Sequence, residues 1–176
     1  MVQLNNELRG RLVGCGGEEQ RLIVLLDREE VAPVEVAYLL YRHAAVALLG
    51  DKRLGFEEFM RLYSKRDPLA VPMLEVYVEL RRRGRLPIPG PRSDTLLLIR
   101  SRRRPTPTHY LLVLEEGRPV KVSMLEEFVE EARRKNLEPV LAIVDRYGDV
   151  TFYTPMVLRP RGEGVLVESL EASSNT

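Results

Sequence analysis

Histidine and cysteine, which often serve as general bases, nucleophiles and metal ligands, are scarce in this sequence, and this limits the kinds of active site it can build. His43 and His109 are the only histidines among the 176 residues, and Cys15 is the only cysteine. A single cysteine excludes an internal disulfide and a thiolate zinc site. Cys15 lies within the glycine-rich stretch 14–17. That context predicts a small residue in a turn, because a cysteine nucleophile also needs a nearby base.

Patterns that bind phosphate or metal are missing as well. The stretch 14–17 lacks the lysine and the serine or threonine of a Walker motif. Adjacent glutamates, as at 130–131, would point about 100° apart on a helix and make no metal site by themselves. A nuclease pattern of the Asp…Glu-x-Lys type would use Asp94 and Lys121, but Pro119 stands at the acidic position. We therefore expect no metal and no cofactor.

His109 is the remaining candidate for a general base. It opens the apolar stretch 109–114 beside Tyr110, with no obvious acid to orient it. This setting favours a solvent-facing histidine at the end of a strand. A basic cluster precedes the stretch and consists of Arg100, Arg102, Arg103 and Arg104.

The segment 118–153 is the best-defined structural unit around these residues. Ser123 with Glu126 forms a capping-box pattern that predicts the start of a helix. The continuous apolar run at 140–144 is typical of a strand covered on both faces. In chain order we expect a short strand at 118–122, a helix from Ser123, a strand at 140–144, a hairpin turn at 145–149 and a strand at 150–153.

Other elements follow from the same periodicities. Asp67 and Pro68 predict the start of a helix, and Gly84 predicts its end. The run 44–49 is short and suggests an edge strand. We also expect strands at 8–13 and 95–99, and a strand or a helix at 21–26, where few residues are β-branched. Helices are expected at 33–42 and 55–63. A hairpin is expected within 157–171, with Val165–Val167 as its second strand, and a disordered tail at about 172–176.

A proline-rich stretch divides the chain. Residues 87–91 hold three prolines, which disfavour a helix or a central strand. We therefore predict an α+β protein with an N-terminal α+β domain at 1–88 and a C-terminal domain at 89–176. The second domain is expected to have a central mixed sheet flanked by helices.

The proportion of arginine among the basic residues is unusual, whereas the net charge is not. The net charge is +1, yet 23 of the 27 basic residues are arginine. Ion-pair networks of a thermophile, a GC-rich genome and simple drift each account for this. The near-neutral total disfavours bulk coating of nucleic acid, so any RNA contact would come from local clusters. With no apolar run of about 20 residues and no signal-peptide pattern, we expect a cytoplasmic protein.

The order of these elements resembles the archaeal tRNA splicing endonuclease family over about residues 30–155. Residues 132–145 (ARRKNLEPVLAIVD) resemble the family's helix and buried strand, and 148–153 (GDVTFY) resemble its G-D-V-T-Y-Y. Further likenesses lie at 36–40, 54–58, 76–84, 93–96 and 109–113. The family cuts pre-tRNA at bulge–helix–bulge introns without a metal, leaving a 2′,3′-cyclic phosphate and a 5′-hydroxyl. It uses a tyrosine, a histidine and a lysine.

The resemblance implies that this chain lacks those three catalytic residues. The tyrosine position falls near Pro91, the histidine position on Pro107 and the lysine position on Leu137. Glu130 stands where catalytic chains carry an arginine that clamps a bulge base. The chain then resembles the non-catalytic structural subunit of a heterotetramer with two catalytic and two structural subunits. The alternatives are an active endonuclease that uses His109, a free-standing RNA-binding module and an unrelated scaffold.

The resemblance also implies how such a subunit would meet its partners. In the family, an acidic turn of one subunit enters a basic pocket of another, and strands near the C-terminus pair side by side. The corresponding interface residues here are Asp145, Tyr147, Asp149, Thr151, Phe152, Tyr153, Val165 and Val167. Arg100, Arg102, Arg103 and Arg104 are the expected contacts to pre-tRNA.

Overall fold

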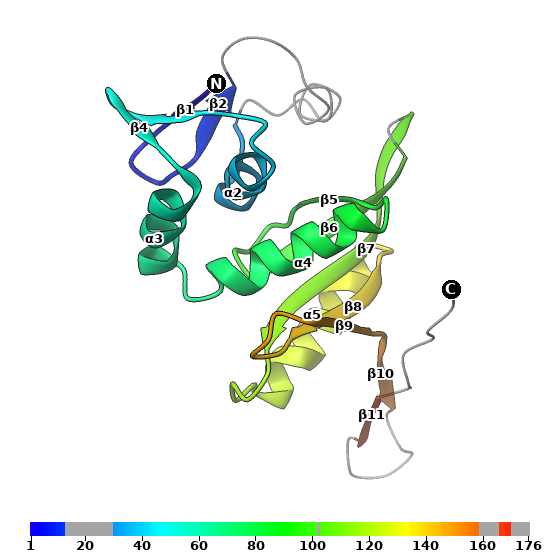
Figure 1. The fold of residues 1–176 in the computed structure, drawn as a ribbon. Helices are drawn as coiled ribbons and strands as arrows, with labels where there is room; N and C mark the ends of the chain where they lie inside the picture. Colours follow the sequence, from blue (N-terminus) through cyan, green and yellow to red (C-terminus); the bar gives the residue numbers. More distant parts are fainter. Residues whose placement is uncertain (13–29, 102, 159–165, 170–176) are drawn as a thin grey trace.

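The structure is a computed structural model that describes residues 1–12, 30–101, 103–158 and 166–169 (Figure 1). Its N-terminal part contains a small four-stranded sheet. The strand order is β2-β1-β3-β4, in which β1 and β3 are parallel and the other neighbours are antiparallel. The strands are β1 (Val2–Leu4), β2 (Gly10–Leu12), β3 (Ala47–Leu49) and β4 (Lys52–Leu54).

The run predicted as an edge strand is therefore an inner strand. β3 pairs with β1 on one side and with β4 on the other. The sequence gives no sign of this, because β1 comes from the first residues of the chain and meets β3 only after α2 has intervened. The region 21–26, predicted as a strand or a helix, lies outside the described residues.

Three helices belong to the N-terminal half of the chain: α2 lies between β2 and β3, and α3 and α4 follow β4. Helix α2 confirms the prediction from Pro33, and Glu35 accepts a hydrogen bond from the backbone N–H of Ala32 at 2.9 Å. Asp67 does not cap the third of these helices directly; its carboxylate accepts the N–H of Leu69 at 2.9 Å in the turn before that helix. The helices are α2 (Pro33–Tyr41), α3 (Phe56–Arg66) and α4 (Ala70–Arg82).

A five-stranded mixed sheet forms the C-terminal part, in the order β5-β6-β7-β8-β9. Only β7 and β8 are parallel, and helix α5 connects them. A further antiparallel pair, β10 and β11, follows the sheet. The bounds are β5 (Leu86–Pro89), β6 (Thr95–Ser101), β7 (Arg104–Glu115), α5 (Val122–Arg134), β8 (Glu138–Val144), β9 (Val150–Tyr153), β10 (Pro155–Leu158) and β11 (Leu166–Ser169). The protein is an α+β fold, as predicted.

Two helices cover the two faces of this sheet. Helix α4 packs on one face, where Leu111 and Ala142 join its core cluster. Helix α5 packs on the other face and buries Phe128 and Val129 against Tyr110. Strand β8 is thus covered on both sides, which explains why its sequence is continuously apolar.

The predicted division at residue 88 falls inside strand β5. Pro87 and Pro89 belong to this strand, which lies at the edge of the sheet and pairs only with β6 among the described residues. An edge strand tolerates proline because one row of its N–H groups has no partner in the sheet. The apolar core also runs across this point, since α4 precedes β5 and packs on the sheet that follows it.

The short strand predicted at 118–122 does not form. After β7 the chain turns at Gly117, which has φ +76°, and residues 118–121 are irregular up to α5. Both sides of β7 are already paired, with β6 and β8, so the returning segment finds no free edge. The predicted capping box is also wrong. Helix α5 begins one residue before Ser123, and its N-cap residue is Lys121, which makes no side-chain capping hydrogen bond.

The C-terminal hairpin forms with shifted bounds. Its second strand is Leu166–Ser169, and Val167 pairs with Val157 in backbone register. Val165 and the tail at 172–176 lie outside the described residues. No helix in the described part of the chain is both long and apolar enough to cross a membrane.

The buried Glu35 provides a test of how helix α2 is held. Only 2% of Glu35 is exposed, so replacing it with alanine would leave the Ala32 N–H without this acceptor. We expect Glu35→Ala to lower the free energy of unfolding by about 1–3 kcal/mol in urea titrations. Glu57→Ala, an exposed change in the first turn of α3, is the matched control and should cost less than about 1 kcal/mol. Equal effects of the two changes would contradict this role.

Candidate functional site

The three positions assigned by resemblance to a catalytic triad hold side chains without a titratable group. Pro91 is exposed in the turn between β5 and β6. Pro107 lies in β7 opposite Ile99. Leu137 joins α5 to β8, and its N–H donates to the Ala132 carbonyl at 2.9 Å. Proline and leucine can neither accept nor donate a side-chain proton in a cleavage reaction.

His109 has an acidic partner that the sequence did not reveal. Its Nε2 lies 3.1 Å from a carboxylate oxygen of Glu138, and its Nδ1 lies 2.8 Å from the Thr108 hydroxyl. His109 and Glu138 are register partners in the parallel pair β7–β8. Parallel register depends on how α5 crosses over, so 29 residues of separation in sequence hid this contact. The imidazole is therefore oriented on both sides while remaining about one third exposed.

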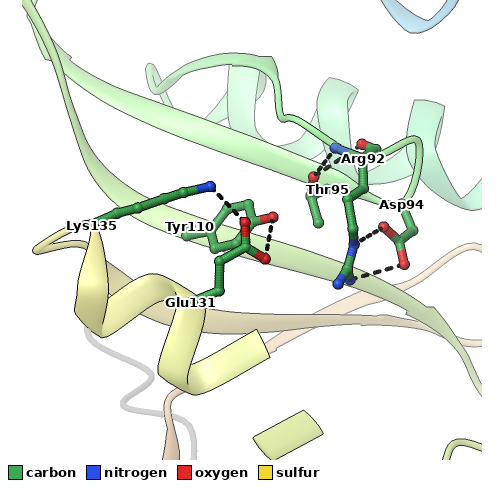
Figure 2. A network of polar contacts seen from close by, with 6 residues as sticks. All are labelled: Arg92, Asp94, Thr95, Tyr110, Glu131 and Lys135. Atoms are coloured by element: carbon green, nitrogen blue, oxygen red, sulfur yellow. Dashed lines mark hydrogen bonds and ion pairs between the residues drawn. The ribbon is translucent and has the colours of Figure 1, made fainter. Parts of the chain in front are cut away.

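A second polar cluster links strand β7 to helix α5 (Figure 2). The Tyr110 hydroxyl donates to one oxygen of Glu131 at 3.2 Å, and Lys135 Nζ donates to the other at 2.5 Å. The Lys135 ammonium also lies 5.2 Å from the centre of the Tyr110 ring. A tyrosine and a lysine thus converge on one carboxylate.

The electrostatics of this cluster favour a structural role. Burial raises the pKa of the Tyr110 phenol, so it stays protonated and donates. The hydrogen bond from Lys135 lowers the pKa of Glu131, which keeps the carboxylate charged. Tyr110 is fully buried, so substrate cannot reach its hydroxyl without displacing α5. The spacing of Glu131 and Lys135, four residues apart on a helix, was the only part of this cluster visible in the sequence.

Arg92 approaches the same region from the β5–β6 turn (Figure 2). Its guanidinium contacts both oxygens of Asp94, at 2.9 and 3.1 Å. Its backbone N–H donates to the Thr95 hydroxyl at 3.1 Å, and that hydroxyl donates back to the Arg92 carbonyl at 3.0 Å. The turn is therefore rigid, and Arg92 is occupied within it. Sequence reasoning did not identify Arg92 as a candidate.

The basic cluster lies at the tip of the long β6–β7 hairpin, which projects beyond the rest of the sheet (Figure 1). Arg100 is near the end of β6, Arg103 is in the turn and Arg104 begins β7. Arg100 and Arg103 are exposed. Arg102 lies outside the described residues. Ser101 pairs with Arg104 in backbone register.

A turn forms at 145–149, as predicted, and its residues differ in what their side chains contact. The Asp145 carboxylate accepts the N–H groups of Tyr147 and Asp149, at 2.8 and 2.9 Å. Gly148, with φ +88°, completes the turn. Asp145 is therefore committed to holding the turn, whereas Tyr147 is 75% exposed. The assignment of this turn to a subunit interface stays a prediction.

Three of the residues predicted to pair with a strand of another subunit lie in β9. Thr151, Phe152 and Tyr153 lie in this outer strand, whose partner among the described residues is β8. The Arg83 guanidinium covers the Phe152 ring at 5.3 Å. No group of three or more potential metal-ligating side chains is found in the described ranges.

Comparison with known proteins identifies the C-terminal part of the chain. Residues 71–152 match the family model of the tRNA intron endonuclease catalytic C-terminal domain. This span runs from α4 through β9, so it holds the five-stranded sheet with both covering helices. The match therefore coincides with the packed unit defined by α4, α5 and the sheet.

Two similar proteins are tRNA-splicing endonucleases of Methanosarcina species. The Methanosarcina mazei protein is 32% identical over 139 residues, which cover 78% of this chain and 39% of that protein. The Methanosarcina acetivorans protein is 30% identical over the same length and shares. The present chain thus spans about two fifths of the length of these relatives. Residues 71–152 are thus similar to the catalytic C-terminal domain of the tRNA intron endonuclease family.

Proposed function

We propose that this chain is the structural subunit of a heterotetrameric tRNA splicing endonuclease. In this role two catalytic chains cut pre-tRNA at bulge–helix–bulge sites, and two chains like this one support assembly and position the substrate. The observation that carries the proposal is the combination of the family match at 71–152 with Pro91, Pro107 and Leu137 at the positions implied for the triad.

The chemistry of metal-independent RNA cleavage supports this reading. Attack by a ribose 2′-hydroxyl needs a base to take its proton and an acid to protonate the leaving oxygen. None of the three residues can serve. Tyr110 and Lys135 are of suitable types, but both are bound to Glu131, and Tyr110 is fully buried.

The 145–149 turn supports an assembly role. Asp145 uses its carboxylate to fix the turn backbone, so the exposed Tyr147 and Asp149 are presented on a rigid tip. A preorganised tip loses little conformational freedom on docking, which favours affinity. Tyrosine is also among the residues that most often dominate interface energy.

One observation favours a second candidate, an active endonuclease that uses His109. The contact with Glu138 at 3.1 Å orients the imidazole, as a general base requires. This candidate needs a further proton donor that neither Tyr110 nor Lys135 supplies in the present arrangement.

Cleavage of a bulge–helix–bulge RNA distinguishes the two candidates. We expect the purified chain alone to leave the RNA intact, and the chain mixed with a catalytic family member from the same genome to cut it. His109→Ala should leave cleavage by the mixture within about twofold, since the histidine is not assigned a catalytic role. Cleavage by this chain alone, abolished by His109→Ala, would instead establish the second candidate.

The assembly role predicts different effects for neighbouring turn residues. Tyr147→Ala and Asp149→Ala should each weaken association with the catalytic chain about tenfold or more, without altering thermal stability of the isolated chain. Asp145→Ala should also lower the stability of the chain, by about 1 kcal/mol, because two backbone N–H groups lose their acceptor. Asp51→Ala, in the exposed turn between β3 and β4, is the control. Sedimentation of mixtures measures association; unchanged association for both Tyr147→Ala and Asp149→Ala would exclude this turn as the contact.

A further inference from the structure

Basic residues from three separate elements meet at one end of the five-stranded sheet. Leu86, which opens β5, pairs with Ile99 near the end of β6, and Ile99 pairs with Pro107 in β7. His109 of β7 pairs with Glu138, which opens β8. The starts of β5, β7 and β8 therefore lie at the same end as the β6–β7 hairpin tip.

Both covering helices also finish at this end. Helix α4 passes into β5 through Gly84, with φ +71°, and α5 passes into β8 through Asn136, with φ +54°. Each helix thus runs opposite to the strand that follows it. The residues that close the helices lie next to the strand starts, on opposite faces of the sheet. The arginines gathered here are Arg85, Arg100, Arg103, Arg133 and Arg134, and we call them the sheet-end arginines.

The sheet-end arginines are exposed and form no ion pair with any residue that the structure describes. Three of the nearby acids contact other residues. Glu79 binds Arg82 and Arg83, at 2.7 Å each, and Glu131 binds Lys135. Glu138 contacts His109. The charge of the sheet-end arginines is therefore not neutralised within this part of the chain.

Given the proposed function, on which this step rests, we infer that the sheet-end arginines form one surface that binds the phosphate backbone of an RNA stem. The planar guanidinium forks suit phosphate oxygens. Arg85, Arg133 and Arg134 thereby extend the contact beyond the hairpin to both faces of the sheet end. Double-stranded RNA is recognised mainly by shape and by phosphate and 2′-hydroxyl contacts, which a spread of cations can supply.

A stem fits this surface better than a single strand. Proteins that hold single-stranded RNA combine cations with exposed aromatic side chains on which bases stack. The strongly exposed aromatic residues of the described ranges are Tyr41 and Tyr147. Neither belongs to the hairpin, to the segment after α4 or to the end of α5, and Tyr147 lies in the β8–β9 turn at the opposite end of β8.

The test measures RNA affinity of the full chain by fluorescence anisotropy over a range of salt concentrations. The probes are a stable RNA hairpin stem and a single-stranded RNA of equal length. Two variants remove charge from the surface, Arg100→Gln with Arg103→Gln and Arg133→Gln with Arg134→Gln. The matched control, Arg53→Gln with Arg61→Gln, removes two exposed arginines from β4 and α3, which lie away from the hairpin (Figure 1).

We expect each surface variant to weaken stem binding and to reduce the slope of log Kd against log salt by about one for each arginine removed. The control should leave the slope unchanged. Arg133→Lys with Arg134→Lys keeps the charge at the end of α5 and should retain most of the slope. Thermal unfolding verifies that each variant is folded.

Three outcomes would overturn the inference: no stem binding by the wild-type chain, tighter binding of the single strand, or an unchanged slope for the Arg133 and Arg134 pair. The cleavage assay with a catalytic partner tests the proposed function separately from the inference about the sheet-end arginines. Partner-dependent cleavage with an unchanged slope rejects the surface alone. A reduced slope without partner-dependent cleavage supports the surface and rejects the structural-subunit role.

Discussion

The parallel pairing of β7 with β8 is the constraint on which most of this structure depends. Parallel neighbours cannot be joined by a tight turn, so the chain must cross over one face of the sheet, and α5 does so. The opposite face must then be covered from elsewhere, and α4 covers it. Because α4 precedes the sheet in sequence, this packing binds the N-terminal elements to the C-terminal sheet in one continuous core.

The same pairing arranges the polar residues of the domain. It brings Glu138 beside His109, and it aligns Tyr110 under the end of α5, where Glu131 and Lys135 meet it. These contacts join β8 and α5 to β7.

The two surfaces proposed for partners lie at opposite ends of β8. The 145–149 turn follows the end of this strand, and the sheet-end arginines surround its start. The seven residues of β8 thus separate the turn from the sheet-end arginines.

Local patterns in the sequence were sufficient wherever a few neighbouring residues decide the conformation. They predicted α2 from Pro33, the end of α4 at Gly84 and the turn at 145–149. The α+β class was also readable from periodicity, and the stretches at 132–145 and 148–153 carried the resemblance to the splicing endonuclease family. These features involve residues that are close along the chain.

Tertiary structure alone decided the features that depend on which strand finds a free edge. The inner place of β3, the proline-bearing edge strand β5 and the failure of 118–122 to form a strand follow from strand order. The contacts of His109 with Glu138 and of Tyr110 with Glu131 follow from register and helix crossing. Such pairings join residues far apart in sequence. Several strands compete for the few sheet edges that are free to form hydrogen bonds. Local sequence thus determined the elements, and competition for sheet edges decided where each of them lies.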